Sequence, residues 1–317
     1  MTDQPATVLS VGECMVEFFR RDDGLWRQGF AGDTLNVAWA LRALLQPADW
    51  RIGYMTRIGR DGFSEAMLAF LREAGIASDF IIREADRRPG LYTIETDASG
   101  ERRFSYWRGE SAARRLAADP QALADAFSAA RMIYLSGITL AILPPADRDN
   151  LFVALGRQGD RNFTVAFDPN ARPALWESRE AMQDATMRAA ALADIALPTF
   201  ADEALVFGDA DPQATCDRYA AAGCAEVVVK DGTNPTRWMA GVETGRSPVA
   251  PAASVIDTTG AGDSFNGGYL AARMLGADAR AAIAAGQAVS AVTVGVRGAL
   301  APKQALSEAM RHQSPAN

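Results

Sequence analysis

The chain has 317 residues, of which 49% are apolar, and it carries a formal net charge of −7 at neutral pH. This length and apolar content suffice for one large α/β domain, or for such a domain with an appendage. The negative charge argues against nucleic acid or an anionic membrane as a partner, because phosphate-rich surfaces attract an excess of Lys and Arg.

Several signals of other protein classes are missing from the sequence. The single histidine, His312, lies in a polar tail, so a Ser-His pair or a His-ligated zinc site has no candidate residue. Neither lysine belongs to a P-loop pattern. No signal peptide or membrane span is visible, and the three cysteines lack CxxC spacing. We therefore expect reduced thiols and a cytoplasmic location.

The first third of the chain mixes two kinds of strand with helices. An apolar run over 7–11 predicts a buried strand, and the alternation over 14–30 predicts a β-hairpin that stands apart as part of a lid. A helix is expected to about residue 45, with Asp33 or Thr34 as its N-cap. The further expected elements are a strand over 51–58, a helix over 62–74, and lid strands over 90–95 and 102–108.

From residue 120 onward the pattern alternates regularly between helix and strand. Helices are expected over 120–130, 144–158, 177–191, 201–207, 212–222, from Ser264, and over 278–295; strands over 132–136, 163–167, 195–197 and 226–230; and a hairpin near 236–249. This spacing predicts a doubly wound, mostly parallel sheet flanked by helices. We expect an α/β core of residues 1–12, 31–88 and 112–317, and a small β-sheet lid of residues 13–30 and 89–111.

The most informative stretch is DTTGAGDSFNGG at 257–268. Gly260, Ala261 and Gly262 have almost no side chain, so their backbone N–H groups can approach an anion at the start of the following helix. A carboxylate at Asp263 is then placed to receive a hydroxyl proton next to a bound phosphoryl group. The stretch therefore predicts a kinase.

This stretch resembles the C-terminal signature of the ribokinase-like sugar kinases, the PfkB family, and AGDTLNVA at 31–38 is similar to their N-terminal signature. The resemblance extends over nearly the whole chain. It implies that Asp263 is the catalytic base, that the amides of Gly260, Ala261 and Gly262 form the anion hole for the transferred phosphate, and that ATP and Mg²⁺ are required. We expect Asp263 to stay ionised at its helix N-terminus and to act as a weak base. Asp257 is implied to help bind a monovalent cation, with bracing of the loop as the alternative.

Residues for the sugar are expected at two places in the sequence. One place is a helix start, where a small residue leaves room and two polar side chains can bind sugar hydroxyls: Gly32, Asp33 and Asn36. The alternative for Asp33 is a simple N-cap role. GLYTIE (90–95), FSYWRGESAARRL (104–116) and FDPNARPALW (167–176) resemble the family members that phosphorylate the primary hydroxyl of 2-keto-3-deoxygluconate. By that resemblance Tyr92, Tyr106, Arg108 and Arg172 hold the acidic sugar, for which Arg offers a bidentate fork.

Nucleotide and magnesium residues are implied with some departures from the family pattern. Lys230 and Gly232 end a strand where relatives place residues near the phosphates and ribose, and Gln287 stands where many relatives have an adenine-pocket Asn. Asp202 or Glu203 takes the place of a Glu that organises hydrated Mg²⁺. The adenine contacts and the choice between these two acids stay open.

Two alternative functions stay open, and we also expect a particular oligomeric state. The acceptor could be a neutral sugar such as fructose or ribose, or a nucleoside, and a different class would be a non-catalytic sugar or nucleotide sensor on the same scaffold. An isolated small sheet is marginal, so we expect a homodimer that covers the lid.

Overall fold

The computed structural model describes residues 5–21, 23–96, 102–156 and 161–312. Its large sheet consists of nine strands in the spatial order β13 (Glu243–Ser247), β12 (Thr236–Ala240), β11 (Glu226–Val229), β10 (Ile195–Ala196), β9 (Thr164–Asp168), β8 (Met132–Ser136), β1 (Ala6–Val11), β4 (Trp50–Ile58) and β5 (Ile81–Arg83). The strands from β11 to β5 are parallel, whereas β12 and β13 form an antiparallel extension at one edge. The predicted doubly wound, mostly parallel sheet is confirmed.

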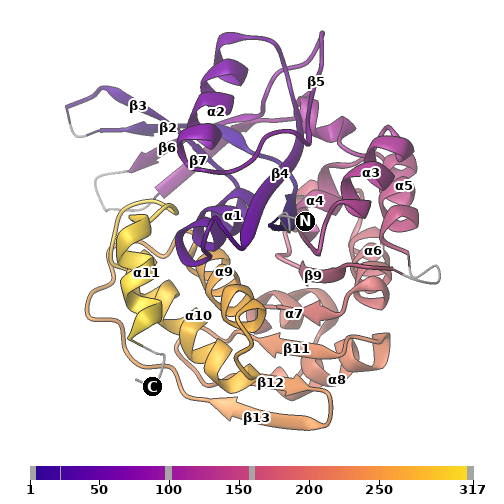
Figure 1. Cartoon of the computed structure of the whole chain (residues 1–317), viewed down its shortest axis with the longest axis vertical. Coiled ribbons are helices and arrows are strands. Elements are labelled where there is room, and N and C mark those ends of the chain that lie inside the picture. The colour runs from indigo at the N-terminus through magenta and orange to yellow at the C-terminus, as the bar shows by residue number, and fades with distance from the viewer. Residues whose placement is uncertain (1–4, 22, 97–101, 157–160, 313–317) are drawn as a thin grey trace.

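Helices cover both faces of this sheet (Figure 1). One face packs against α1 (Asp33–Leu44), α2 (Gly62–Glu73), α9 (Ala261–Met274), α10 (Ala279–Val294) and α11 (Lys303–Arg311). The other packs against α3 (Pro120–Ser128), α4 (Gly137–Ile142), α5 (Pro145–Leu155), α6 (Arg179–Leu192), α7 (Phe200–Phe207) and α8 (Pro212–Ala222). Short 3₁₀ turns lie at Ala112–Arg115 and Pro173–Leu175. Neighbouring strand residues supply the two cores in alternation: Val8 and Val228 point to one, Leu9 and Val227 to the other.

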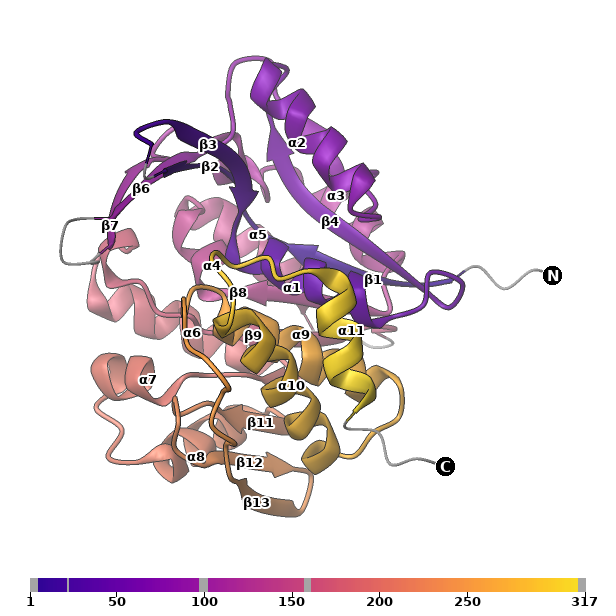
Figure 2. The same cartoon turned by 90° about the vertical axis from the view of Figure 1, so that its left-hand side faces the viewer.

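A second, four-stranded sheet, which we call the small sheet, lies apart from the large one (Figure 2). Its order is β3 (Trp26–Ala31), β2 (Met15–Arg20), β6 (Leu91–Thr96) and β7 (Arg102–Trp107), with both hairpins antiparallel and β2 parallel to β6. These are the four alternating strands expected from the sequence. One face packs on α2 through Phe18 against Phe63 and Phe30 against Phe70.

Helices α1 and α9 pack closely beside each other. Gly267 has no room for a methyl group, because an added Cβ would lie 2.5 Å from the Cβ of Ala40. Gly268 is equally tight against α10, since its Cβ would lie 2.9 Å from the Cα of Gly286. Small residues at these positions let the backbones approach, and α9 is therefore held between α1 and α10.

Two helices were not foreseen from the sequence. The segment Gly137–Ile142 forms α4 directly after β8, capped by the Ser136 side chain. Residues expected to be a tail form α11, whose Leu306 is buried. No helix within the described residues is long and apolar enough to cross a membrane.

Candidate active site

The glycine-rich loop leads into α9 earlier than expected. The N-cap is Gly260, in the left-handed region at φ 75°, and the helix begins at Ala261 rather than near Ser264. An added Cβ at Gly260 would lie 2.6 Å from the Cβ of Ala299, so that packing and backbone conformation both require glycine. Asp263 consequently lies within the first turn of α9, where its carboxylate is close to the N-terminal end of the helix dipole.

The three amides predicted as an anion hole are not equivalent. The Ala261 N–H donates to the Thr258 carbonyl at 3.2 Å, so this amide is already hydrogen-bonded within the loop. Gly262 has an open side, because the nearest atom to an added Cβ there is the Lys230 Nζ at 3.8 Å. An anion seated at Gly262 would thus meet a helix N-terminus and a lysine ammonium together.

Asp263 is held by a residue from the other end of the sequence. Asn36 Nδ2 donates to Asp263 Oδ2 at 2.8 Å, while the buried Asn36 Oδ1 has no hydrogen-bond partner within the described structure. Although Asp263 keeps some exposure, the protein atoms packed around it raise its pKa to about 7. The carboxylates of Asp33 and Asp168 push this pKa in the same direction, against the Asn36 hydrogen bond and Lys230.

This electrostatic result corrects the expectation of a fully ionised, weak base. The Asn36 hydrogen bond and Lys230 do favour the carboxylate, but removal from water and two neighbouring acids outweigh them. A carboxylate whose pKa lies near neutral pH is a better general base than an ordinary Asp, because it binds a proton more tightly while a substantial fraction of it is still deprotonated. Asp263 is therefore suited to accept a proton from a hydroxyl.

Asp33 connects the start of α1 with the loop after β9. Its Oδ1 accepts from the Thr34 N–H at 2.8 Å and its Oδ2 from Asn170 Nδ2 at 2.8 Å. The N-cap of α1 is Gly32, without a side-chain cap, so the assignment of that role to Asp33 or Thr34 was wrong. Asn170 adopts φ 35° and its N–H donates to Asp168 Oδ1 at 3.0 Å.

Lys230, directly after β11, lies in a buried polar network. Its Nζ donates to Asp168 Oδ2 at 2.8 Å and to Asn266 Oδ1 at 3.0 Å. Asn266 Nδ2 in turn donates to Asp168 Oδ2 at 2.6 Å and to the Tyr134 hydroxyl at 3.1 Å. The network fixes the ammonium beneath the loop at Gly262. Asp168 forms an ion pair with this ammonium.

The other residues expected near the nucleotide lie further along this edge. Gly232 has φ 57°, which suits glycine in the turn after β11. Gln287, on α10, donates from Nε2 to the Thr236 hydroxyl at 3.3 Å. This contact ties α10 to the start of β12.

The two candidate magnesium acids are clearly distinguished. Glu203 is buried and accepts from Arg218 at 2.8 Å and from the Tyr219 hydroxyl at 3.2 Å, within an ion-pair cluster of α7 and α8. Asp202 accepts from the Ala171 N–H at 3.2 Å and lies 3.9 Å from Arg172 Nη1, so only it adjoins the loop after β9. Among the described residues no group of three His, Cys, Asp or Glu side chains forms a metal cage.

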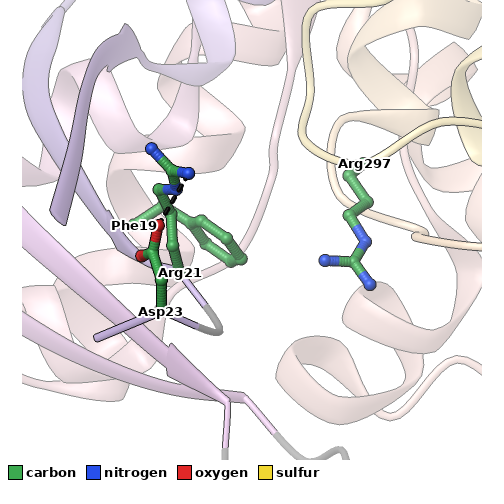
Figure 3. A pocket seen from close by; sticks show the side chains of 4 residues that line it. All are labelled: Phe19, Arg21, Asp23 and Arg297. Carbon is green, nitrogen blue, oxygen red and sulfur yellow. Dashed lines mark ion pairs between the residues drawn. The ribbon is translucent and has the colours of Figure 1, made fainter. Parts of the chain in front are cut away.

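Asp257 joins two loops at the rim of the site. It accepts from the Thr259 N–H at 3.0 Å and from the Gly298 N–H at 2.5 Å. Next to Gly298, the Arg297 side chain lies across a pocket of about 370 Å³ from Phe19, Arg21 and Asp23 of the small-sheet hairpin (Figure 3). Arg21 and Asp23 form an ion pair at 2.7 Å. This hairpin turn and the loop that contains Arg297 and Gly298 face the same pocket.

The aromatic residues predicted for the acceptor stack on the small sheet. Tyr92 and Tyr106 are register partners with ring centroids 5.6 Å apart, and Phe104 extends the stack at 6.3 Å from Tyr106. Tyr92 is buried and its hydroxyl donates to Glu17, whereas Tyr106 is 54% exposed. The stack therefore offers an open aromatic face at Tyr106.

The two arginines predicted for the acceptor differ in their surroundings. Arg108 forms an ion pair with Glu13, and both side chains are largely buried. Arg172 has a half-exposed side chain whose Nη1 donates to its neighbour's carbonyl, Ala171 O, at 2.7 Å. A second pocket, of about 750 Å³, is lined by Tyr106 and Arg108 among other residues of segments 86–89 and 106–111.

Contacts link the sugar-side candidates into one assembly. Gly32, Asp33, Asn36 and Asp263 lie at the α1–α9 junction, and the carbonyl of Glu13 lies so close to Gly32 that an added Cβ would be 2.2 Å from it. Glu13 pairs with Arg108 and so connects this junction to the small sheet. Glu13, Glu17, Asn170 and Asn266 were not singled out from the sequence.

An aspartate in the first turn of a helix that follows a glycine-rich loop, with a lysine beneath it and a second sheet beside it, defines a sugar kinase of the ribokinase-like fold. The chain belongs to the pfkB family of carbohydrate kinases, whose profile matches residues 5–306. It is 38% identical over 301 residues to the 2-dehydro-3-deoxygluconokinase of Dickeya dadantii, which covers 93% of this chain and 97% of that protein. It is 34% identical over 304 residues to the protein of that name from Haemophilus influenzae, with 94% and 96% coverage.

Solved structures agree with the fold. A putative ribokinase II from E. coli superposes with a TM-score of 0.83 at 23% identity, covering 97% of this chain and 99% of that one. The 2-dehydro-3-deoxygluconokinase of Thermotoga maritima gives 0.81 at 20% identity, with 97% and 98% coverage. These neighbours establish a ribokinase-like architecture for both sheets.

Proposed function

We propose that this kinase transfers a phosphoryl group from ATP to the primary hydroxyl of 2-keto-3-deoxygluconate, the acid also called 2-dehydro-3-deoxygluconate. The observation that carries phosphoryl transfer is Asp263, with its pKa near 7, beside the open Gly262 and Lys230. The choice of acceptor rests on relatives 34–38% identical that carry this name. It also rests on two arginines: Arg108, which lines a pocket together with Tyr106 of the aromatic stack, and Arg172 in the loop after β9.

The chain's own residues divide the chemistry among them. Asp263 receives the hydroxyl proton, and the unpartnered Asn36 Oδ1 is placed to accept a hydrogen bond from a sugar hydroxyl beside it. The loop at Gly260–Gly262 and Lys230 offer positive potential where negative charge spreads over the transferred group. Positioning and electrostatics, without a covalent intermediate, therefore account for the reaction.

Magnesium fits this site only as a hydrated ion. Bound Mg²⁺ would neutralise phosphate charge, and it takes most of its ligands from phosphates and water. Asp202, half-buried beside the loop after β9, is the carboxylate that we assign to a magnesium-bound water, because Glu203 is fully engaged by Arg218 and Tyr219.

The small sheet acts as a lid in this proposal, with residues 13–30 and 89–111 closing over the core of residues 1–12, 31–88 and 112–317. Tyr92, Tyr106 and Arg108 would then cover the acceptor from one side while Asn36 and Asp263 meet it from the other. Closure would exclude water, which otherwise competes as an acceptor. The pocket between Arg297 and the hairpin turn is space that such a movement would reduce.

An acceptor screen tests the proposal. ADP release would be measured with 2-keto-3-deoxygluconate, fructose, ribose and a nucleoside at equal concentrations. We expect kcat/KM to be highest for the keto acid by at least about tenfold, since a buried arginine is better matched to a carboxylate than to a hydroxyl. Equal activity on fructose would favour the neutral-sugar alternative, and no ADP with any sugar would favour the sensor.

We propose further that the protein forms a homodimer through the small sheet. Its outer strand β7 carries Trp107, which is 61% exposed, and β3 begins with Trp26, which is 44% exposed. Exposed strand edges with large apolar side chains favour pairing. Light scattering should give twice the chain mass, and a monomer at micromolar concentration would contradict this.

The monovalent cation and the location are also proposals. Asp257 bridges two loops beside the anion site, where a cation would act indirectly on Gly260. Activity that is equal in potassium and in a large organic cation would leave Asp257 with a bracing role. We infer a cytoplasmic location from the use of ATP and from three buried cysteines that lack CxxC spacing.

A further inference from the structure

Glu13 is a buried carboxylate that the proposed chemistry does not use. It follows β1 and precedes β2, and its side chain is 1% exposed. Arg108, which is 95 residues further along the chain, donates to it from Nη2. Two atoms of this pair, Glu13 Oε1 and Arg108 Nε, are buried without a hydrogen-bond partner in the described structure. One is an acceptor and the other a donor, so the pair is able to tighten into a two-bond fork.

The backbone around Glu13 is shaped to keep it there. An added Cβ at Gly90 would lie 2.7 Å from Glu13 Oε1 and 3.1 Å from Arg108 Cβ, so glycine makes room for the ion pair. Gly32, at the start of α1, lies against the Glu13 carbonyl in the same way. Glu13 thus occupies the junction between the acceptor end of the core and Gly90, the residue before β6.

We propose that Glu13 is a positioning residue that holds Arg108 for the acceptor carboxylate and thereby sets the preference for an acidic sugar; this inference rests on the proposed function. A free arginine side chain loses much rotamer freedom when it binds, and one already fixed by a buried carboxylate loses less. With one edge of the guanidinium facing Glu13, the remaining N–H groups are left for the acceptor. A paired arginine also attracts unrelated anions less than a bare one, because its charge is compensated.

Glu13→Gln tests this with little change in shape. We expect KM for the keto acid to rise about tenfold while kcat changes less than about threefold, because binding and not the chemical step is affected. KM for ATP should stay unchanged, and so should kcat/KM for fructose. Glu95→Gln is the control, since Glu95 forms an exposed ion pair with Arg20 on the same sheet and should behave as wild type.

A double-mutant cycle separates positioning from a general structural role. In an Arg108→Ala background, Glu13→Gln should have no further effect on KM, because its only route to the acceptor has been removed. If the two effects are additive, or if Glu13→Gln alone leaves KM unchanged, the inference is overturned. Should Glu13→Gln not fold, Glu13→Asp, which keeps the charge but is too short to reach Arg108, should raise KM similarly, and a normal KM would overturn the inference. A wild-type enzyme without activity on the keto acid overturns the proposed function, and the inference with it.

Discussion

The candidate site has a core end, formed by the large-sheet domain around Asp263, and a second side formed by the small sheet. The two differ in how far hydrogen bonds within the protein already hold their side chains in place. At the core end, Asp263, Lys230 and Asp168 are each held by hydrogen bonds of 2.6–3.0 Å from residues of other elements. On the small sheet, Tyr106 is 54% exposed, and the other predicted acceptor residue Arg172, in the loop after β9, is also half-exposed. The phosphoryl-transfer groups are therefore organised before substrate arrives, whereas part of the acceptor site is completed on binding.

The base should give the largest effect. Asp263→Asn removes the proton acceptor but keeps the size of the side chain, so kcat should fall by about 10³-fold or more, within the upper range for loss of a general base. ATP affinity, measured by calorimetry, should change little. Turnover like that of wild type would contradict the assignment and would mean that the core end is organised for something else.

The buried network beneath the loop should decide stability. Lys230→Met leaves the buried Asp168 carboxylate without its cation, and the free energy of unfolding should fall by about 3–5 kcal/mol in urea denaturation. Glu95→Gln breaks an ion pair of the small sheet whose side chains are 54% and 43% exposed, and should cost less than about 1 kcal/mol. Equal losses would remove the difference between the two regions.

The two acceptor arginines should differ from each other. Arg108→Ala removes a buried, fixed guanidinium, and KM for the keto acid should rise about 10- to 100-fold. Arg172→Ala removes a half-exposed side chain, and less than about a tenfold rise is expected. Steady-state kinetics on both variants would check this, and the reverse ranking would place the acid-binding group on the core side.

The smallest effect is a shift in pH dependence. With the pKa of Asp263 at about 7, kcat/KM for the acceptor should fall as the pH drops through neutrality, because the base becomes protonated. Asp33→Asn removes a charge that raises this pKa, so the midpoint should move to lower pH. Asn36→Ala removes a hydrogen bond that lowers it, so the midpoint should move to higher pH. If neither variant shifts the midpoint of the pH profile, a group other than Asp263 controls the fall in kcat/KM at low pH.

Much of the fold was predictable because periodicity alone identifies long elements. The parallel strands, their helices and the four strands of the small sheet follow from alternation and from apolar runs. Helix α4 was missed because six mostly apolar residues directly after a buried strand look like its continuation. Helix α11 was missed because most of its nine residues are polar, and only its packing, with Lys303 over the Trp39 ring at 4.3 Å, secures it.

The site was predictable in its motifs but less so in its electrostatics. Asp263 is marked by its glycines, yet its pKa depends on Asp33 and Asp168, which are distant in sequence. Glu13 was overlooked although it follows a buried strand at the carboxyl edge, where open α/β sheets bind ligands. Its partner lies 95 residues away, so no local pattern could pair them.

The close approach of α1 and α9 has a consequence for the geometry of catalysis. Asn36 and Asp263, which touch across the two helices, each lie one turn before the tight pair Ala40 and Gly267. The separation between the Asn36 amide and Asp263, the proposed base, thus depends on the absence of a side chain at Gly267. A single added carbon atom at residue 267 would push the two helices apart. The length of the proposed proton-transfer path therefore depends on helix packing outside the site.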